Sequence, residues 1–199
     1  MGRRKEEPAK IKELILESAQ KLFSRFGFKK TAVEEIARMA KLAKGTIYNY
    51  FESKDEIIRS VFRREEEKLF NRLREKIEKE TSPKLKLKRA ILEKLKLLRE
   101  SPVLAQVLTE KRERLIAGLE KELERLEQIE AELIEEILKE GNFQLKMAEK
   151  ELGESARVIQ QALRGLEASY LEGNRERIEK DAELLITLLF EGLEKKPSG

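Results

Sequence analysis

Residues 42–56 read LAKGTIYNYFESKDE. The spacing of Ile47 and Phe51 predicts a short helix over residues 44–50 with one buried face. Lysine, threonine, tyrosine and asparagine side chains are left on or near its exposed face. These groups can hydrogen-bond phosphate oxygens and base edges, so their neighbours along the chain determine how the segment is interpreted.

The residues before this segment predict two further helices. Apolar residues recur at steps of three and four over residues 10–26, and Gly27 can end that helix. Thr31 and Glu34 have the spacing of a capping box, which predicts a second short helix to about Ala40. The three residues 41–43 suffice only for a tight turn. Two helices this short need the first one for support, and together they predict a helix-turn-helix module.

Charge and composition narrow the possible functions. Residues 1–54 hold 13 Lys and Arg against 7 Glu, whereas residues 55–199 hold 30 against 32 acidic residues, so the basic excess is N-terminal. A local positive field of this kind favours a polyanionic partner. Cysteine and histidine are absent, which removes disulfides, the usual zinc sites and imidazole catalysis. The charged fraction of 41% resembles that of thermophile proteins.

The remainder of the chain also predicts helices. Ser53 and Glu56 open a helix over about 54–79, and Ser82-Pro83 and Ser101-Pro102 begin two more. A long helix is expected over about 110–139, then a connection over 142–153, then helices over about 155–171 and 178–195. The predicted fold is all-α, with a helix-turn-helix domain over 1–53 and a larger helical bundle over 54–199. No apolar run is long enough for a membrane span and no secretory signal is visible, so we expect a cytoplasmic protein.

Residues 10–58, and above all AKGTIYNYFESKDEI, resemble the N-terminal domain of the TetR family of bacterial transcriptional regulators. The resemblance implies a homodimeric, ligand-responsive repressor that a small effector releases from a palindromic operator on double-stranded DNA. It implies that the DNA-binding residues are Thr31, Val33, Lys44, Gly45, Thr46, Tyr48, Asn49, Tyr50 and Lys54. No metal, cofactor or enzymatic activity is expected.

The segment departs from the family pattern at three positions. Lys41 stands at a turn position where glycine is common, which predicts a left-handed backbone conformation. Ala32 and Ala43 replace frequent hydroxyl residues, so part of the expected phosphate-contact set is missing. A side chain at Gly45 would hold the helix away from the groove floor.

Two further sites are predicted in the bundle. The family layout places the effector pocket among residues 54–171, and an apolar or amphipathic effector is expected because histidine and convergent charges are missing. Candidate lining residues are Phe62, Phe70, Leu104, Leu108, Leu119, Phe143 and Tyr170. The last two helices carry enough apolar surface for a dimer interface, for which we select Ile159, Leu163, Leu166, Leu185, Leu188 and Leu189.

Two other functions remain possible from the sequence. The heptad-like leucines of residues 110–139 could instead form an intermolecular coiled coil in an interaction protein, which would bind DNA weakly and without sequence preference. An enzyme is the third possibility, but paired carboxylates such as Glu135 and Glu136 are expected on any charge-rich helix.

Overall fold

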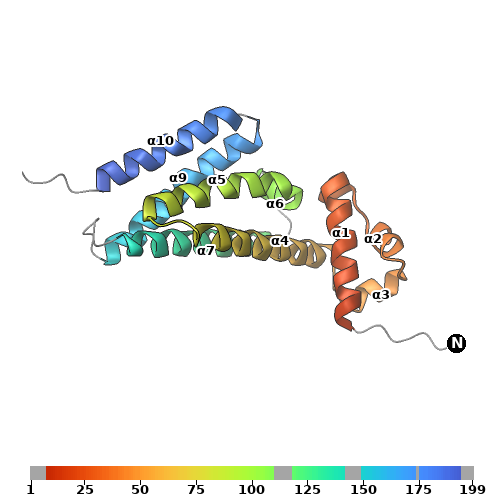
Figure 1. Ribbon diagram of the computed structural model, residues 1–199. Helices are drawn as coiled ribbons and strands as arrows, with labels where there is room; N and C mark the ends of the chain where they lie inside the picture. Colours follow the sequence, from red (N-terminus) through yellow and green to blue (C-terminus); the bar gives the residue numbers. More distant parts are fainter. Residues whose placement is uncertain (1–7, 110–117, 142–148, 174, 194–199) are drawn as a thin grey trace, which may run out of the picture. The chain divides into compact units, whose positions relative to one another are not determined.

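The chain folds into α-helices in a computed structural model that describes residues 8–109, 118–141, 149–173 and 175–193 (Figure 1). No strand occurs within these ranges. The helices are α1 (Pro8–Lys30), α2 (Val33–Met39), α3 (Lys44–Tyr48), α4 (Lys54–Ile77), α5 (Pro83–Glu100), α6 (Pro102–Thr109), α7 (Leu119–Glu140), α9 (Glu149–Leu171) and α10 (Arg175–Leu193). The all-α prediction, with an N-terminal helix-turn-helix, is confirmed.

The described helices fall into two compact units. The first comprises residues up to Glu67 together with Ser101–Glu122, and the second comprises Lys68–Glu100 and the residues from Leu123 onward. Helices α4 and α7 each contribute to both units. The functional boundary between residues 53 and 54 stays a prediction.

The core of the first unit is formed by apolar residues of α1 to α4. Ile15, Phe23, Ile36, Ile47 and Phe51 are all at most 1% exposed. Burial of each such side chain contributes about 1.5–3 kcal/mol. Helix α1 contacts both α2 and α6, so this core supports α2 and α3, which are too short to be stable alone.

Local backbone features agree with most of the sequence signals. Gly27 interrupts α1 with φ 77°, and Lys41 has the predicted left-handed conformation, with φ 55°. Ser53 Oγ accepts a hydrogen bond from Glu56 N at 3.1 Å, and Ser82 Oγ accepts one from Leu85 N at 3.3 Å, so both serines cap their helices.

Three local predictions are wrong. Thr31 is not the N-cap of α2, because its hydroxyl donates to Gly27 O at 2.8 Å while Ala32 N donates to Glu35 Oε2 at 2.8 Å. The long helix expected from residue 110 begins at Leu119, after Gly118, whose φ is 82°; residues 110–117 lie outside the described ranges. Helix α9 begins at Glu149, within the stretch expected to be a connection.

The second unit is a bundle built around α5, α7, α9 and α10. Helix α10 contacts α5 and α9, and α5 contacts α9 (Figure 1). The leucine-rich face of α7 is buried inside the single chain: Leu126, Leu133, Ile137 and Leu138 are at most 6% exposed. These side chains are therefore unavailable for a coiled coil with another chain.

Candidate functional site

Helix α3 has one buried residue and an otherwise open surface. Ile47 is fully buried, whereas Lys44, Gly45, Tyr48 and Asn49 are exposed and Thr46 and Tyr50 are half-buried. Tyr48 is 47% exposed, which is unusual for so large an aromatic side chain. The structure thus brings six of the predicted DNA-binding residues together on or next to this short helix.

Gly45 lies on the open surface of α3. A Cβ atom built at this position would meet no atom within 4 Å. The fold itself therefore does not require glycine here, and the missing side chain leaves the surface of α3 accessible to a close partner.

Lys44 is paired with an acidic residue of α2. Its Nζ lies 2.5 Å from Glu34 Oε1 and 5.8 Å from the centre of the Tyr48 ring. The hydrogen bond with Glu34 raises the pKa of Lys44, and the same bond lowers the pKa of Glu34. Both side chains are more than half exposed, so the pair lies in solvent and can be exchanged for another partner.

The other predicted DNA-binding residues are less accessible. Thr31 is 1% exposed and Val33 is 7% exposed. Lys54 Nζ donates to the backbone carbonyl oxygens of Phe28 at 3.1 Å and Thr31 at 3.3 Å. These contacts tie the start of α4 to the end of α1, next to the start of α2.

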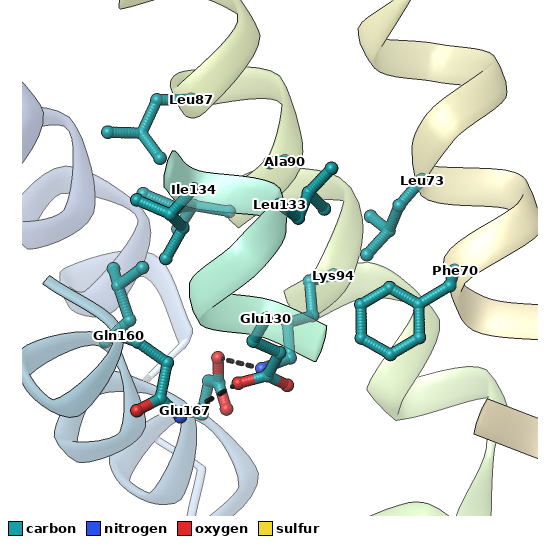
Figure 2. A pocket seen from close by; sticks show the side chains of 12 residues that line it. Phe70, Leu73, Leu87, Ala90, Lys94, Glu130, Leu133, Ile134, Gln160 and Glu167 are labelled. Atoms are coloured by element: carbon teal, nitrogen blue, oxygen red, sulfur yellow. Dashed lines mark hydrogen bonds and ion pairs between the residues drawn. The ribbon is translucent and has the colours of Figure 1, made fainter. Parts of the chain in front are cut away.

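A pocket of mainly apolar character lies in the second unit. It is a small cavity of about 30 Å³, lined by residues of α4, α5, α7 and α9 (Figure 2). The apolar lining residues are Phe70, Leu73, Leu87, Ala90, Ile91, Leu133, Ile134 and Leu163. The four polar lining residues are Lys94, Glu130, Gln160 and Glu167.

The polar residues of the pocket form one connected cluster. Lys94 Nζ lies 2.5 Å from both Glu130 Oε1 and Glu167 Oε1, and Gln160 Nε2 donates to Glu130 Oε2 at 3.1 Å. Burial, together with the charge of Glu130, raises the pKa of Glu167 to about 7 against the attraction of Lys94. The raised pKa of Lys94 reflects its two carboxylate partners, which outweigh burial.

This cluster is absent from the residues predicted from the sequence, although the sequence contains a signal for it. Glu130 interrupts the apolar stripe of Leu126, Leu133 and Ile137 at helical spacing, as Lys94 does between Ile91 and Leu98. A charged residue in the middle of an apolar stripe is seldom buried without a specific partner.

Phe70 is the one predicted effector-pocket residue among the lining of this pocket. Phe62, Leu104 and Leu119 are buried in the first unit, where Leu108 is half-buried. Tyr170 is buried in the second unit, and Phe143 lies outside the described residues.

The residues predicted for the dimer interface differ in exposure. Leu188 is 57% exposed, and Leu166, Leu185 and Leu189 are half-buried. Ile159 and Leu163 are buried within the chain, and Leu163 lines the pocket. Val158 and Leu184, which our prediction omits, are 66% and 57% exposed on α9 and α10.

Residues 15–61 match the family model described as "Bacterial regulatory proteins, tetR family". The match covers α2, α3, the turn between them and the start of α4. This N-terminal segment is of the TetR type. Within the described residues, no group of three or more acidic residues could hold a metal ion.

Relatives of this chain include two proteins of Bacillus subtilis (strain 168). An uncharacterized HTH-type transcriptional regulator, YhgD, is 45% identical over 51 residues, which is 26% of this chain and 27% of that protein. The fatty acid metabolism regulator protein is 32% identical over 84 residues, covering 42% of this chain and 43% of the relative. The alignments thus span less than half of either relative.

A solved structure resembles this chain over nearly its full length. The transcriptional regulator FadR of Bacillus subtilis, in complex with stearoyl-CoA, has a TM-score of 0.66 and 24% identity, with coverage of 92% of this chain and 97% of that one. This likeness supports the same fold. Among the helices described here, none is long and apolar enough to cross a membrane.

Proposed function

We propose that the protein is a homodimeric repressor whose α3 helices enter successive major grooves of a palindromic operator. The observation that carries this proposal is the exposed polar face of α3 over the buried Ile47. A short helix with this composition, braced by α1 and α2, has the form that reads base edges in helix-turn-helix proteins.

The side chains of α3 divide into base-contacting and phosphate-contacting groups. Tyr48, Asn49 and Thr46 supply hydroxyl and amide groups suited to base edges, and Gly45 permits close approach to the groove. Lys44 supplies an ammonium group for a phosphate. The burial of Thr31 and Val33 supports a positioning role at the start of α2, and Lys54 acts in the same way at the start of α4.

Dimerisation through α9 and α10 fits the exposed apolar side chains of these helices. Val158, Leu184 and Leu188 are each more than half exposed in the single chain. A two-fold axis through this surface would present two identical α3 helices, so the operator would be a palindrome with half-sites about one helical turn apart.

A small, mainly apolar effector bound in the second unit would release the operator. The apolar walls of the pocket support this class of ligand. The long acyl chain of stearoyl-CoA, the molecule bound to the FadR neighbour, supports it as well. Helix α4 can link effector binding to operator binding, because it begins at Lys54, next to the helix-turn-helix, and carries Phe70, which lines the pocket.

An interaction protein built on an intermolecular coiled coil is the less favoured alternative. Its required surface, the leucine face of α7, is already buried within the chain. Such a protein would bind DNA without sequence preference.

The proposal is tested by selecting bound sequences from a random DNA pool at near-physiological salt. We expect enrichment of a palindrome that is lost with Tyr48→Ala or Lys44→Ala. Lys150→Ala, whose side chain is 89% exposed on α9, is the matched control and should keep the enrichment. A folded, dimeric protein that enriches no sequence would refute the repressor proposal.

A further inference from the structure

The polar cluster of the pocket contains more negative than positive charge. Two carboxylates, of Glu130 and Glu167, share one ammonium group, of Lys94 (Figure 2). All three side chains are 9–10% exposed, so solvent contributes little compensation. Gln160 adds an amide donor but no charge. One negative charge therefore remains uncompensated inside the pocket when both carboxylates are ionised.

Arg164, a further cation that acts on Glu167, does not remove this excess. Arg164 is paired with Glu127, away from the pocket lining, and among the named influences on the pKa of Glu167 its attraction is the weakest. A pKa of about 7 at Glu167 indicates that the site takes up a proton near neutral pH. An uncompensated buried charge is costly, so a second cation would be favoured there over an anion.

The apolar side chains around the cluster indicate which chemical groups the ligand carries beside its charged group. Phe70 and Leu73 of α4, Leu87 of α5 and Leu133 of α7 line the same space, and none of them can hydrogen-bond. Phe70, Lys94 and Glu130 all line this pocket (Figure 2). A cation accompanied by apolar carbon atoms would match both the charge and the walls of the pocket.

We propose that the pocket of the second unit binds an amphipathic organic cation, whose protonated amine sits at Glu130 and Glu167 and whose apolar body lies against Phe70, Leu87 and Leu133. This inference rests on the proposed function, because it names the chemical class of the effector. Carboxylate-headed or phosphate-headed ligands are excluded from the cluster, because they would add charge of the sign already in excess.

Three probes with the same eight-carbon chain test the proposal: octylammonium, octanol and octanoate, which carry positive, zero and negative charge at pH 7.5. Isothermal titration of the full chain should give at least tenfold tighter binding of octylammonium than of octanol, with octanoate weakest. Equal or tighter binding of octanol or octanoate would overturn the assignment, as would binding of palmitoyl-CoA with its head group at the cluster.

Variants at the cluster make the test specific. Glu167→Gln keeps the shape of the side chain and removes the excess charge, so the preference for octylammonium over octanol should fall at least tenfold. Glu132→Gln is the control, because Glu132 is an exposed carboxylate on the same helix as Glu130. An unchanged preference in Glu167→Gln would contradict the proposal.

Proton release gives a second measurement that needs no variant. If octylammonium takes the place of the proton on Glu167, titrations near pH 7 in buffers of different ionisation enthalpy should detect a fraction of a proton released. Zero release would contradict binding at this carboxylate. Release of the operator is measured in a separate experiment. If octylammonium binds but the operator is not released, the effector mechanism is refuted while the ligand class stands. If the operator is released by another ligand and octylammonium does not bind, the ligand class is refuted.

Discussion

The Lys44 ammonium group on α3 lies 2.5 Å from the Glu34 carboxylate on α2, so the cation proposed to reach a phosphate is held by a neighbouring acid. Both partners remain more than half exposed. Binding to DNA would exchange one anionic partner of Lys44 for another and would leave Glu34 close to the phosphate backbone. The pair should therefore limit the affinity for any DNA sequence.

Replacing Glu34 with glutamine tests this effect. Glu34→Gln should strengthen operator binding by about two- to fivefold at moderate salt, because it removes a repulsive charge and frees Lys44. Fluorescence anisotropy with a labelled operator measures the change. Glu176→Gln, an exposed acid on α10, should leave the affinity unchanged; weaker binding by Glu34→Gln would show that Glu34 is needed to orient Lys44.

A substitution at Gly45 should weaken DNA binding without destabilising the fold. Gly45→Ala should leave the free energy of unfolding unchanged or raise it by up to about 1 kcal/mol, because a Cβ meets no atom and alanine favours helix. Operator binding should fall at least tenfold, because the methyl group faces the groove. The control is Glu132→Ala, at an exposed residue of α7 outside both proposed interfaces, which should keep full binding. Full binding by Gly45→Ala would refute close approach at this position.

The buried Glu167 predicts a specific dependence of stability on pH. Its folded-state pKa of about 7 lies above the ordinary value of 4.5, so the proton that it keeps stabilises the fold fully below about pH 4.5. That stabilisation, about 3 kcal/mol, is lost as pH rises through about 7. Lys94, Glu130 and Arg164 are the charged groups that influence this titration.

Urea unfolding between pH 5 and 8 isolates this contribution when the parent chain is compared with Glu167→Gln. The difference in the free energy of unfolding should change across the interval and level off above about pH 7.5. A constant difference would mean that Glu167 has an ordinary pKa in the folded protein.

The exposed leucines of α10 predict the behaviour of the dimer. Leu188→Glu should convert the dimer to a monomer with unchanged helical content, because Leu188 is 57% exposed in the single chain. Light scattering after size-exclusion chromatography measures the mass. Leu85→Glu, at a leucine 45% exposed on α5, should remain dimeric. A dimer that survives Leu188→Glu would place the interface elsewhere.

Features that depend on neighbouring residues in the chain were predictable from the sequence. The caps at Ser53 and Ser82 and the left-handed Lys41 follow from local hydrogen bonding and backbone sterics. Thr31 was misplaced because its hydroxyl has two possible partners within four residues, and only the bend at Gly27 makes the carbonyl of that residue available.

The pocket could not be predicted in the same way. Its lining combines single faces of α4, α5, α7 and α9, and their mutual packing depends on contacts between residues far apart in the chain. Phe70 was found because it lies on the helix that follows the DNA-binding module. Lys94, Glu130 and Glu167 were missed because each one resembles an ordinary surface charge unless its place in an apolar stripe is noticed.

Glu65 of α4 is 2% exposed and accepts hydrogen bonds from two other helices. Gln20 Nε2 on α1 donates to it at 2.8 Å, and the amide of Leu104 on α6 donates at 3.2 Å. A fragment cut after residue 53 would lose this buried acceptor together with the α6 surface that α1 covers. Recombination that exchanges DNA-reading heads among such regulators would therefore have to carry the beginning of α4 and a matching α6, although neither of these segments touches DNA in our proposal.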